Sequence, residues 1–138
     1  MKKSIAIMAS LIISPISFSM ADSQTVEKLV QAYATEGVIT ADAAQGKRLW
    51  NKTFKAKGNP VERSCASCHT KDLSAPGKHV KTHKVIKPMA PSANPERLTD
   101  VRKIEKWFKR NCKWTLGREC SAQEKTDLLL YINNPTNF

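Results

Sequence analysis

The chain has 138 residues, a length that fits one small domain and is too short for two independent cores. Hydrophobic residues make up 41% of the chain and charged residues 25%, which excludes a disordered or membrane-embedded protein. There are 23 lysines and arginines against 12 acidic residues, and the resulting net charge of +11 implies an anionic partner or surface without identifying it.

The first 21 residues have the pattern of an export signal. Two lysines near the start precede an apolar stretch, and small residues stand where a signal peptidase cuts. A transmembrane anchor is the alternative, but the apolar stretch of about a dozen residues is short of the ~20 needed to cross a bilayer. We therefore expect a signal peptide over residues 1–21 and a mature domain over residues 22–138 with no transmembrane segment. We also expect a periplasmic location, where disulfides persist and nucleic acid is not a partner.

Two helices are expected before the first cysteine. The first covers about residues 24–36, with Ser23 as its cap. The second begins after Thr40 and includes Phe54. Gly46 lies inside this second helix, where glycine costs roughly 0.5–1 kcal/mol relative to alanine. We therefore expect another backbone to cross very close to Gly46.

Cys65, Cys68 and His69 form a CxxCH motif, the signature of covalent haem attachment. Two cysteines at this spacing can reach both vinyl groups of one macrocycle, and the adjacent histidine can bind the iron as its proximal ligand. A thioredoxin-like CxxC would need a βαβ setting, and a zinc site would need a second cysteine pair of suitable spacing. The sequence supplies neither, so we expect one covalent haem c.

The segment from Thr70 to Leu98 contains four prolines, which exclude a long helix in its second half. Unstructured connections of this length are uncommon in small domains unless they cover a ligand. We expect a long wrapping loop, and a cofactor would account for it.

A third helix is expected over about residues 101–112, after a cap at Thr99 or Asp100. The amide of Asn111 would need a hydrogen-bonding partner if it were buried on the inner face. At about 100° per residue, that face comprises Val101, Ile104, Trp107, Phe108, Asn111 and Cys112.

Ser121 and Glu124 form a capping box for a last helix over about residues 122–133. No segment shows convincing period-two alternation and there is no internal repeat. The expected class is therefore all-α with a large loop content.

The order of several features resembles the class I cytochrome c plan. Gly46 and Trp50 precede the CxxCH motif, and Leu130 and Tyr131 lie in the last helix. In class I cytochromes c the first and last helices cross at a glycine contact. The resemblance implies a class I cytochrome c-like domain with a long haem-wrapping loop, and it supplies a reason for Gly46.

A narrower set of residues resembles the sphaeroides haem protein (SHP) family of monohaem c-type cytochromes, over about residues 40–133. The most distinctive element is Asn111-Cys112 followed shortly by Cys120. The resemblance implies an asparagine axial ligand at Asn111 and a stabilising ring closed by Cys112 and Cys120. The other matching segments are Pro88-Met89-Ala90-Pro91-Ser92, Asn94-Pro95, Thr99-Asp100 and Lys106-Trp107-Phe108.

Several residues could provide the sixth iron ligand opposite His69. Met89, flanked by prolines, is the usual cytochrome choice, although it follows His69 closely and could instead pack under the haem rim. His79 and His83 are further candidates, in a lysine-rich loop. Asparagine near a helix end is often a cap. Because of its inner-face position and the family resemblance, we expect Asn111 as the ligand and keep Met89 as the alternative.

An amide oxygen is a hard donor that suits ferric iron better than ferrous iron, so reduction should loosen Asn111. The resemblance likewise implies reduced members that lose the asparagine and bind oxygen or nitric oxide. We expect an electron carrier rather than an enzyme, with an acidic redox partner steered by lysines such as those of Lys78 to Lys87. The resemblance points to a dihaem cytochrome c as that partner.

Three other functions remain open. One is a dedicated haem ligand-binding or oxygen-handling protein, and another is a conventional cytochrome c with histidine and methionine ligands. A peroxidase-like enzyme is less favoured, because only His79 or His83 could supply a distal acid or base.

Overall fold

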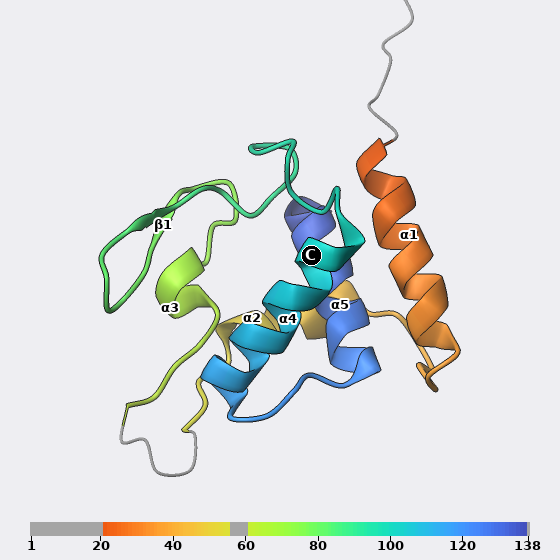
Figure 1. Ribbon diagram of the computed structural model, residues 1–138, viewed down its shortest axis with the longest axis horizontal. Coiled ribbons are helices and arrows are strands. Elements are labelled where there is room, and N and C mark those ends of the chain that lie inside the picture. Colours follow the sequence, from red (N-terminus) through yellow and green to blue (C-terminus); the bar gives the residue numbers. More distant parts are fainter. Residues whose placement is uncertain (1–20, 56–60, 138) are drawn as a thin grey trace, which may run out of the picture.

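The computed structural model describes residues 21–55 and 61–137, and its elements are mostly α-helices, which confirms the all-α class (Figure 1). Within these ranges no helix is both long enough and apolar enough to cross a bilayer. The expected signal peptide lies outside the described residues, apart from its last residue. The elements in chain order are α1 (Ala21–Ala34), α2 (Ala43–Asn51), α3 (Ala66–His69), β1 (Gly77–Lys78), β2 (Val85–Ile86), α4 (Val101–Leu116), α5 (Ala122–Asn133) and the 3-10 helix η1 (Pro135–Asn137).

Side chains cap α4 and α5 as the sequence predicts. Asp100 accepts hydrogen bonds from the backbone N–H groups of Arg102 (2.8 Å) and Lys103 (3.2 Å). At α5, the Glu124 backbone N–H donates to the Ser121 hydroxyl (3.1 Å), and the Ser121 N–H donates to the Glu124 carboxylate (2.9 Å). These bonds satisfy N–H groups that the first turn of a helix leaves unpaired.

The boundaries of the first two helices differ from those expected. Helix α1 begins before Ser23, which therefore lies inside the helix and does not cap it. Helix α2 is capped by Asp42 rather than beginning after Thr40, because aspartate is the stronger cap of the two. Phe54, expected inside this helix, instead forms an isolated antiparallel bridge with Arg63.

The core is organised around the crossing of α2 and α5. A Cβ atom added at Gly46 would lie only 2.0 Å from the carbonyl oxygen of Asp127, which confirms the expected close crossing. One turn further along α2, the buried Trp50 packs edge-on against Tyr131, with ring centroids 6.1 Å apart. Helix α1 also packs on α5. Its buried side chains are Val26, Leu29 and Tyr33.

A short hairpin interrupts the long loop expected over residues 70–98. Strands β1 and β2 are antiparallel, with Gly77 opposite Ile86. Strands of two residues are too short to leave an alternating pattern, so the sequence does not predict them. A Cβ atom at Gly77 would lie 2.1 Å from the carbonyl oxygen of Cys68, so the hairpin packs directly on α3 (Figure 1).

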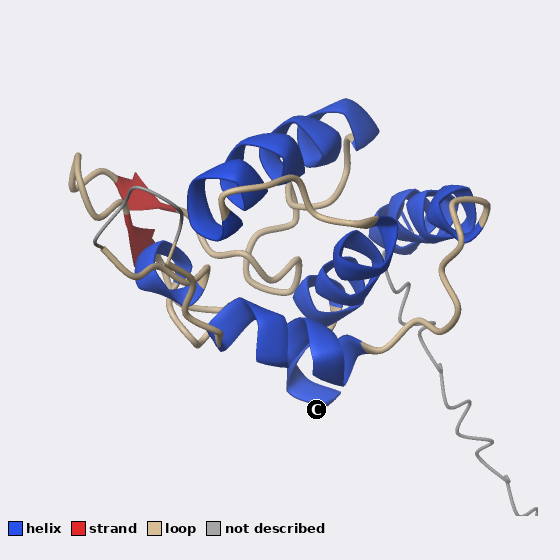
Figure 2. Cartoon of the chain, turned by 90° about the horizontal axis from the view of Figure 1, so that it is seen from below, coloured by secondary structure: helices blue, strands red, loops and turns tan. Residues whose placement is uncertain are grey.

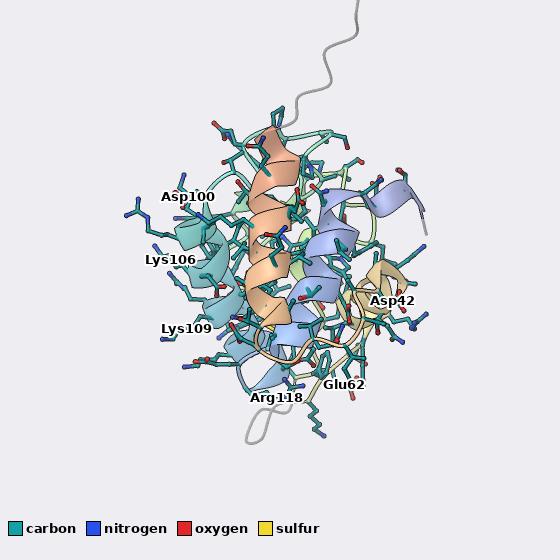
Figure 3. All side chains as sticks on the ribbon, turned by 90° about the vertical axis from the view of Figure 1, so that its right-hand side faces the viewer. Asp42, Glu62, Asp100, Lys106, Lys109 and Arg118 are labelled. Carbon is teal, nitrogen blue, oxygen red and sulfur yellow. A yellow bond between two sulfur atoms is a disulfide. The ribbon has the colours of Figure 1, made fainter. Side chains whose placement is uncertain are left out.

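Helix α4 lies apart from the close pairing of α2 and α5. Figure 2 shows it along the upper side of the molecule, with loop segments between it and α2. It continues past the expected end at Cys112 to Leu116 and stops at Gly117, whose φ of 77° favours glycine. Lys106 and Lys109 project outward from it (Figure 3). Its buried residues are Ile104, Phe108, Cys112 and Thr115.

Candidate functional site

The two cysteines of the CxxCH motif have free thiols: Cys65 directly precedes α3 and Cys68 lies within it. Cys65 is half-buried and Cys68 is buried, and the two do not form a disulfide with each other. Reciprocal bonds fix the turn: the Ser64 N–H donates to the Ser67 hydroxyl (3.0 Å) and the Ser67 N–H donates to the Ser64 hydroxyl (3.1 Å). Burial raises the pKa of the Cys65 thiol to about 11, so this sulfur is protonated at neutral pH. A rigid turn thus presents two thiols three residues apart.

His69 follows at the end of α3 and has the properties of a metal ligand. Burial lowers the pKa of its imidazole to about 4, with smaller electrostatic contributions from Arg97 and His79. The ring is therefore neutral at pH 7, the form that binds iron. Its buried Nδ1 atom has no hydrogen-bonding partner among the described residues. The ring centroid lies 5.5 Å from that of Trp50, whose indole N–H donates to the Thr70 carbonyl (2.9 Å).

The structure places Asn111 differently from the expectation. Asn111 is exposed and Trp107 is 49% exposed, so neither belongs to the buried stripe of α4. Both residues lie at the edge of the inner face that was predicted from a rotation of about 100° per residue. At that edge, a small rotation of the helix about its axis determines whether a side chain is buried or exposed. Together with Trp114 they form a second stripe at positions i, i+4 and i+7. The Asn111 side-chain amide forms no hydrogen bond with the residues that the structure describes.

Arg63 connects this second stripe to the CxxCH motif. Its guanidinium lies 4.0 Å from the centroid of the Trp114 ring and donates to the Trp114 carbonyl (3.1 Å). The His79 ring lies on the same tryptophan, with centroids 6.2 Å apart. Because Arg63 is two residues before Cys65, it fixes the end of α4 relative to the two thiols.

A disulfide connects Cys112 to Cys120, with the Cα atoms 5.5 Å apart and both residues buried. The ring it closes contains the end of α4 and the turn at Gly117. A bidentate pair between Arg118 and Glu124, with both bonds at 2.7 Å, lies beside it. Since Cys112 directly follows Asn111, the cross-link restrains the backbone next to that amide.

The structure also places the other candidate ligands, Met89, His79 and His83. Met89 is half-buried against the core, and its N–H and that of Ala90 both donate to the Leu73 carbonyl (2.9 Å each). The Nδ1 atom of His79 accepts two backbone N–H groups of the hairpin turn, and His83 is exposed within that turn.

One charged residue near His69 carries no signal in the sequence. Arg97 is half-buried, and its Nε and Nη2 atoms donate to the carbonyls of Pro88 (2.8 Å) and Lys87 (2.7 Å). No pattern separates it from the chain's other basic residues. The two free thiols and the neutral imidazole fit a haem c, which presents two vinyl groups and an iron. The exposed amide of Asn111 and the half-buried Arg97 are compatible with it.

Comparisons with known proteins show which family the chain resembles. Residues 36–132 match the family described as a domain of unknown function, DUF1924. Cytochrome c-type protein SHP of Cereibacter sphaeroides is 38% identical over 114 residues, 83% of this chain and 87% of that protein. The structure of oxidised SHP, described as an oxygen-binding cytochrome c, aligns with a TM-score of 0.72 at 39% identity, covering 78% of this chain and 95% of the other.

Cytochrome c'' of Methylophilus methylotrophus is 36% identical over 124 residues, 86% of this chain and 85% of that protein. Its solution structure, which concerns haem-ligand detachment, aligns with a TM-score of 0.70 at 35% identity, covering 80% of this chain and 94% of the other.

Proposed function

The chain belongs to the SHP family of monohaem c-type cytochromes. From this we propose that it carries single electrons and that His69 and Asn111 would bind the iron of its haem. Cys65 and Cys68 would hold its one haem c through thioether bonds. When bound, the haem supplies the one-electron couple of its iron. The turn around Cys65 and the cross-link at Cys112 would hold His69 and Asn111 in place.

The observation that carries this proposal is the environment of Asn111. Its amide has no bonding partner among the described residues, lies between two tryptophans on α4, and directly precedes a cross-linked cysteine. Because Asn111 is exposed, its amide is free to turn toward a bound group, while the cross-link at Cys112 restrains its backbone. Met89 is instead packed on the segment around Leu73, which favours a structural role.

The two ligands are expected to respond differently to reduction. His69 is the neighbour of the two attachment cysteines and its imidazole binds iron in both oxidation states. The hard amide oxygen of Asn111 binds ferrous iron weakly and should leave it on reduction. The freed position would then be open to oxygen or nitric oxide. Two relatives support this: SHP is described as an oxygen-binding cytochrome c, and the structure of cytochrome c'' concerns haem-ligand detachment.

A second function follows from the same labile ligand. If oxygen or nitric oxide binding is the purpose, the protein is a dedicated haem ligand-binding protein rather than a carrier. Both functions use the same residues. The observation that distinguishes them is whether the protein exchanges electrons rapidly with another protein, as a carrier must.

We propose that the acidic redox partner docks on the hairpin beside α3. Lys78, Lys81 and Lys84 are exposed there, and the exposed apolar side chains of Val80 and Val85 accompany them. The hairpin packs on the segment that carries both attachment cysteines. A patch of cations around a few apolar side chains suits transient docking, which needs a small interface and electrostatic steering. The expected partner is a periplasmic dihaem cytochrome c.

Two variants of the holoprotein test the ligand. Asn111→Ala should change the ferric optical spectrum, because the sixth donor is lost. Met89→Leu, a change of similar volume, should leave the spectrum unchanged. The reverse result, with a methionine-to-iron charge-transfer band in the oxidised protein, would assign Met89 instead. Stopped-flow electron exchange with a purified dihaem cytochrome c separates a carrier from a gas-binding protein.

A further inference from the structure

Arg63 contacts one tryptophan of α4 in two ways. Its guanidinium carbon lies 4.0 Å from the centroid of the Trp114 ring, within the range of a cation–π interaction. Its Nη1 atom also donates to the Trp114 backbone carbonyl (3.1 Å). Both residues are half-buried, and no carboxylate among the described residues pairs with this guanidinium. The tryptophan, rather than an acidic group, therefore orients the Arg63 side chain.

The backbone of Arg63 is itself fixed. Its N–H donates to the Phe54 carbonyl (2.9 Å), and its carbonyl accepts from the Phe54 N–H (2.7 Å). The next residue, Ser64, is buried and exchanges hydrogen bonds with Ser67 in the turn that contains Cys65. Arg63 therefore belongs to a well-anchored segment that leads directly into the haem-attachment cysteines.

Trp114 lies close to Asn111 on α4. Three residues separate them along the chain, so they lie on neighbouring sides of the helix with a rise of about 4.5 Å between them. Between the two, Cys112 is cross-linked to Cys120, which ties this end of α4 to the connection before α5. The contact with Arg63 ties it to a different part of the molecule, the segment before α3. Two restraints therefore act on the backbone around Asn111.

We propose that Arg63 is a positioning residue for the sixth ligand: by holding Trp114 it fixes the end of α4 relative to the attachment cysteines and stabilises the bond between Asn111 and ferric iron. This inference rests on the axial ligand proposed above and adds a residue that controls its release. A donor held in place loses little freedom when it binds, whereas a donor on a mobile helix end must first be ordered. Loss of the Arg63 side chain should therefore weaken the ferric bond without removing either ligand.

The test is the affinity of the ferric holoprotein for imidazole, followed by the shift of the haem absorption band. Imidazole binds only when Asn111 has left the iron, so its apparent dissociation constant increases with the strength of the amide bond. A cation–π contact and a hydrogen bond from the same guanidinium together correspond to about a tenfold change in an equilibrium. We expect Arg63→Gln to lower the apparent dissociation constant for imidazole by about three- to tenfold, because the full contact energy is an upper limit.

The ferrous protein separates positioning of Asn111 from a general effect on the fold. In the ferrous state Asn111 is expected to have left the iron, so carbon monoxide should bind Arg63→Gln and the wild-type protein at the same rate. A change in this rate as large as the change in ferric imidazole affinity would show that Arg63 shapes the haem surroundings in both oxidation states. The proposal would then be wrong.

A double-variant cycle connects the effect to the amide. In the Asn111→Ala background there is no amide to displace, so Arg63→Gln should change the imidazole affinity there by less than about twofold. An undiminished effect in this background would overturn the proposal. If Asn111→Ala alone leaves the imidazole affinity unchanged, the amide is not the ligand, and this refutes the proposed ligand set together with the inference that rests on it.

The matched control is a second arginine that lies over a tryptophan. The Arg110 guanidinium lies 5.3 Å from the centroid of the Trp107 ring, but both residues belong to α4, so this contact does not join the helix to the attachment segment. Arg110→Gln should therefore change the imidazole affinity by less than about twofold. An effect equal to that of Arg63→Gln would attribute the result to the lost charge and contradict the proposal.

A second variant decides if Arg63→Gln does not acquire haem. Trp114→Leu removes the ring from the other side of the same contact and lies far in sequence from the attachment cysteines. It should also lower the apparent dissociation constant for imidazole, and an unchanged value would overturn the proposal.

Discussion

Removing the bond between Cys112 and Cys120 tests how the end of α4 is stabilised. In the chain-entropy model, a cross-link between residues eight apart lowers the entropy of the unfolded chain by about 8 cal/mol/K, or about 2.5 kcal/mol at 25 °C. Replacing both cysteines with alanine avoids leaving a buried hydroxyl. Lost packing at the two buried sulfurs adds about 1 kcal/mol. We therefore expect the double variant to lose about 2.5–3.5 kcal/mol of unfolding free energy.

Guanidinium denaturation of the ferric holoprotein, followed by far-UV circular dichroism, measures this loss. The matched control is the exposed ion pair between Lys113 and Glu119 (3.0 Å), which spans part of the same ring. Replacing that pair with alanine should cost less than about 1 kcal/mol. If the double cysteine variant is destabilised no more than this control, the entropic argument for the ring is wrong.

Two further predictions concern α2 and α5. Gly46→Ala gains roughly 1 kcal/mol of helix propensity but forces a methyl group against the Asp127 carbonyl, and overpacking costs typically about 1–3 kcal/mol. Thermal unfolding should therefore show a lower Tm, whereas the exposed Gln45→Ala should change it little; a raised Tm for Gly46→Ala would contradict the close crossing. A hydrogen bond from Arg118 lowers the pKa of Glu124 in the folded protein below its ordinary value of 4.5. Ionised Glu124 therefore stabilises the fold at pH values above 4.5, and this stabilisation is lost as the pH falls through the lowered pKa of the folded state. Denaturation midpoints from about pH 3 to 7 should depend less on pH in Glu124→Gln, and parallel curves for the two proteins would refute this linkage.

Local chemistry allowed several features to be predicted from the sequence. Glycine inside an amphipathic helix has few explanations, and Gly46 does lie at a backbone crossing. Asp100 and the Ser121–Glu124 pair cap their helices because each pattern satisfies specific N–H groups. These features depend on residues close in sequence or on steric exclusion, which the amino-acid pattern records directly.

Features that depend on tertiary contacts could not be predicted in the same way. Helical periodicity predicts which way the apolar face of a helix points, but not how wide that face is. It therefore predicts Asn111 on the inner face of α4, whereas the structure has this residue exposed at the edge of that face. The β1–β2 hairpin is too short to leave a pattern. The carboxylate of Glu96 pairs with Lys87 and not with the adjacent Arg97. The sequence does not determine which of the two cations Glu96 pairs with.

The central claim, that reduction opens the coordination position held by Asn111, is tested most directly by carbon monoxide binding to the ferrous protein. Stopped-flow rates should increase in proportion to carbon monoxide concentration, because no internal ligand has to leave first. A rate that reaches a plateau at low concentration, or an absence of binding, would show that an internal ligand still occupies the ferrous iron and would contradict the claim.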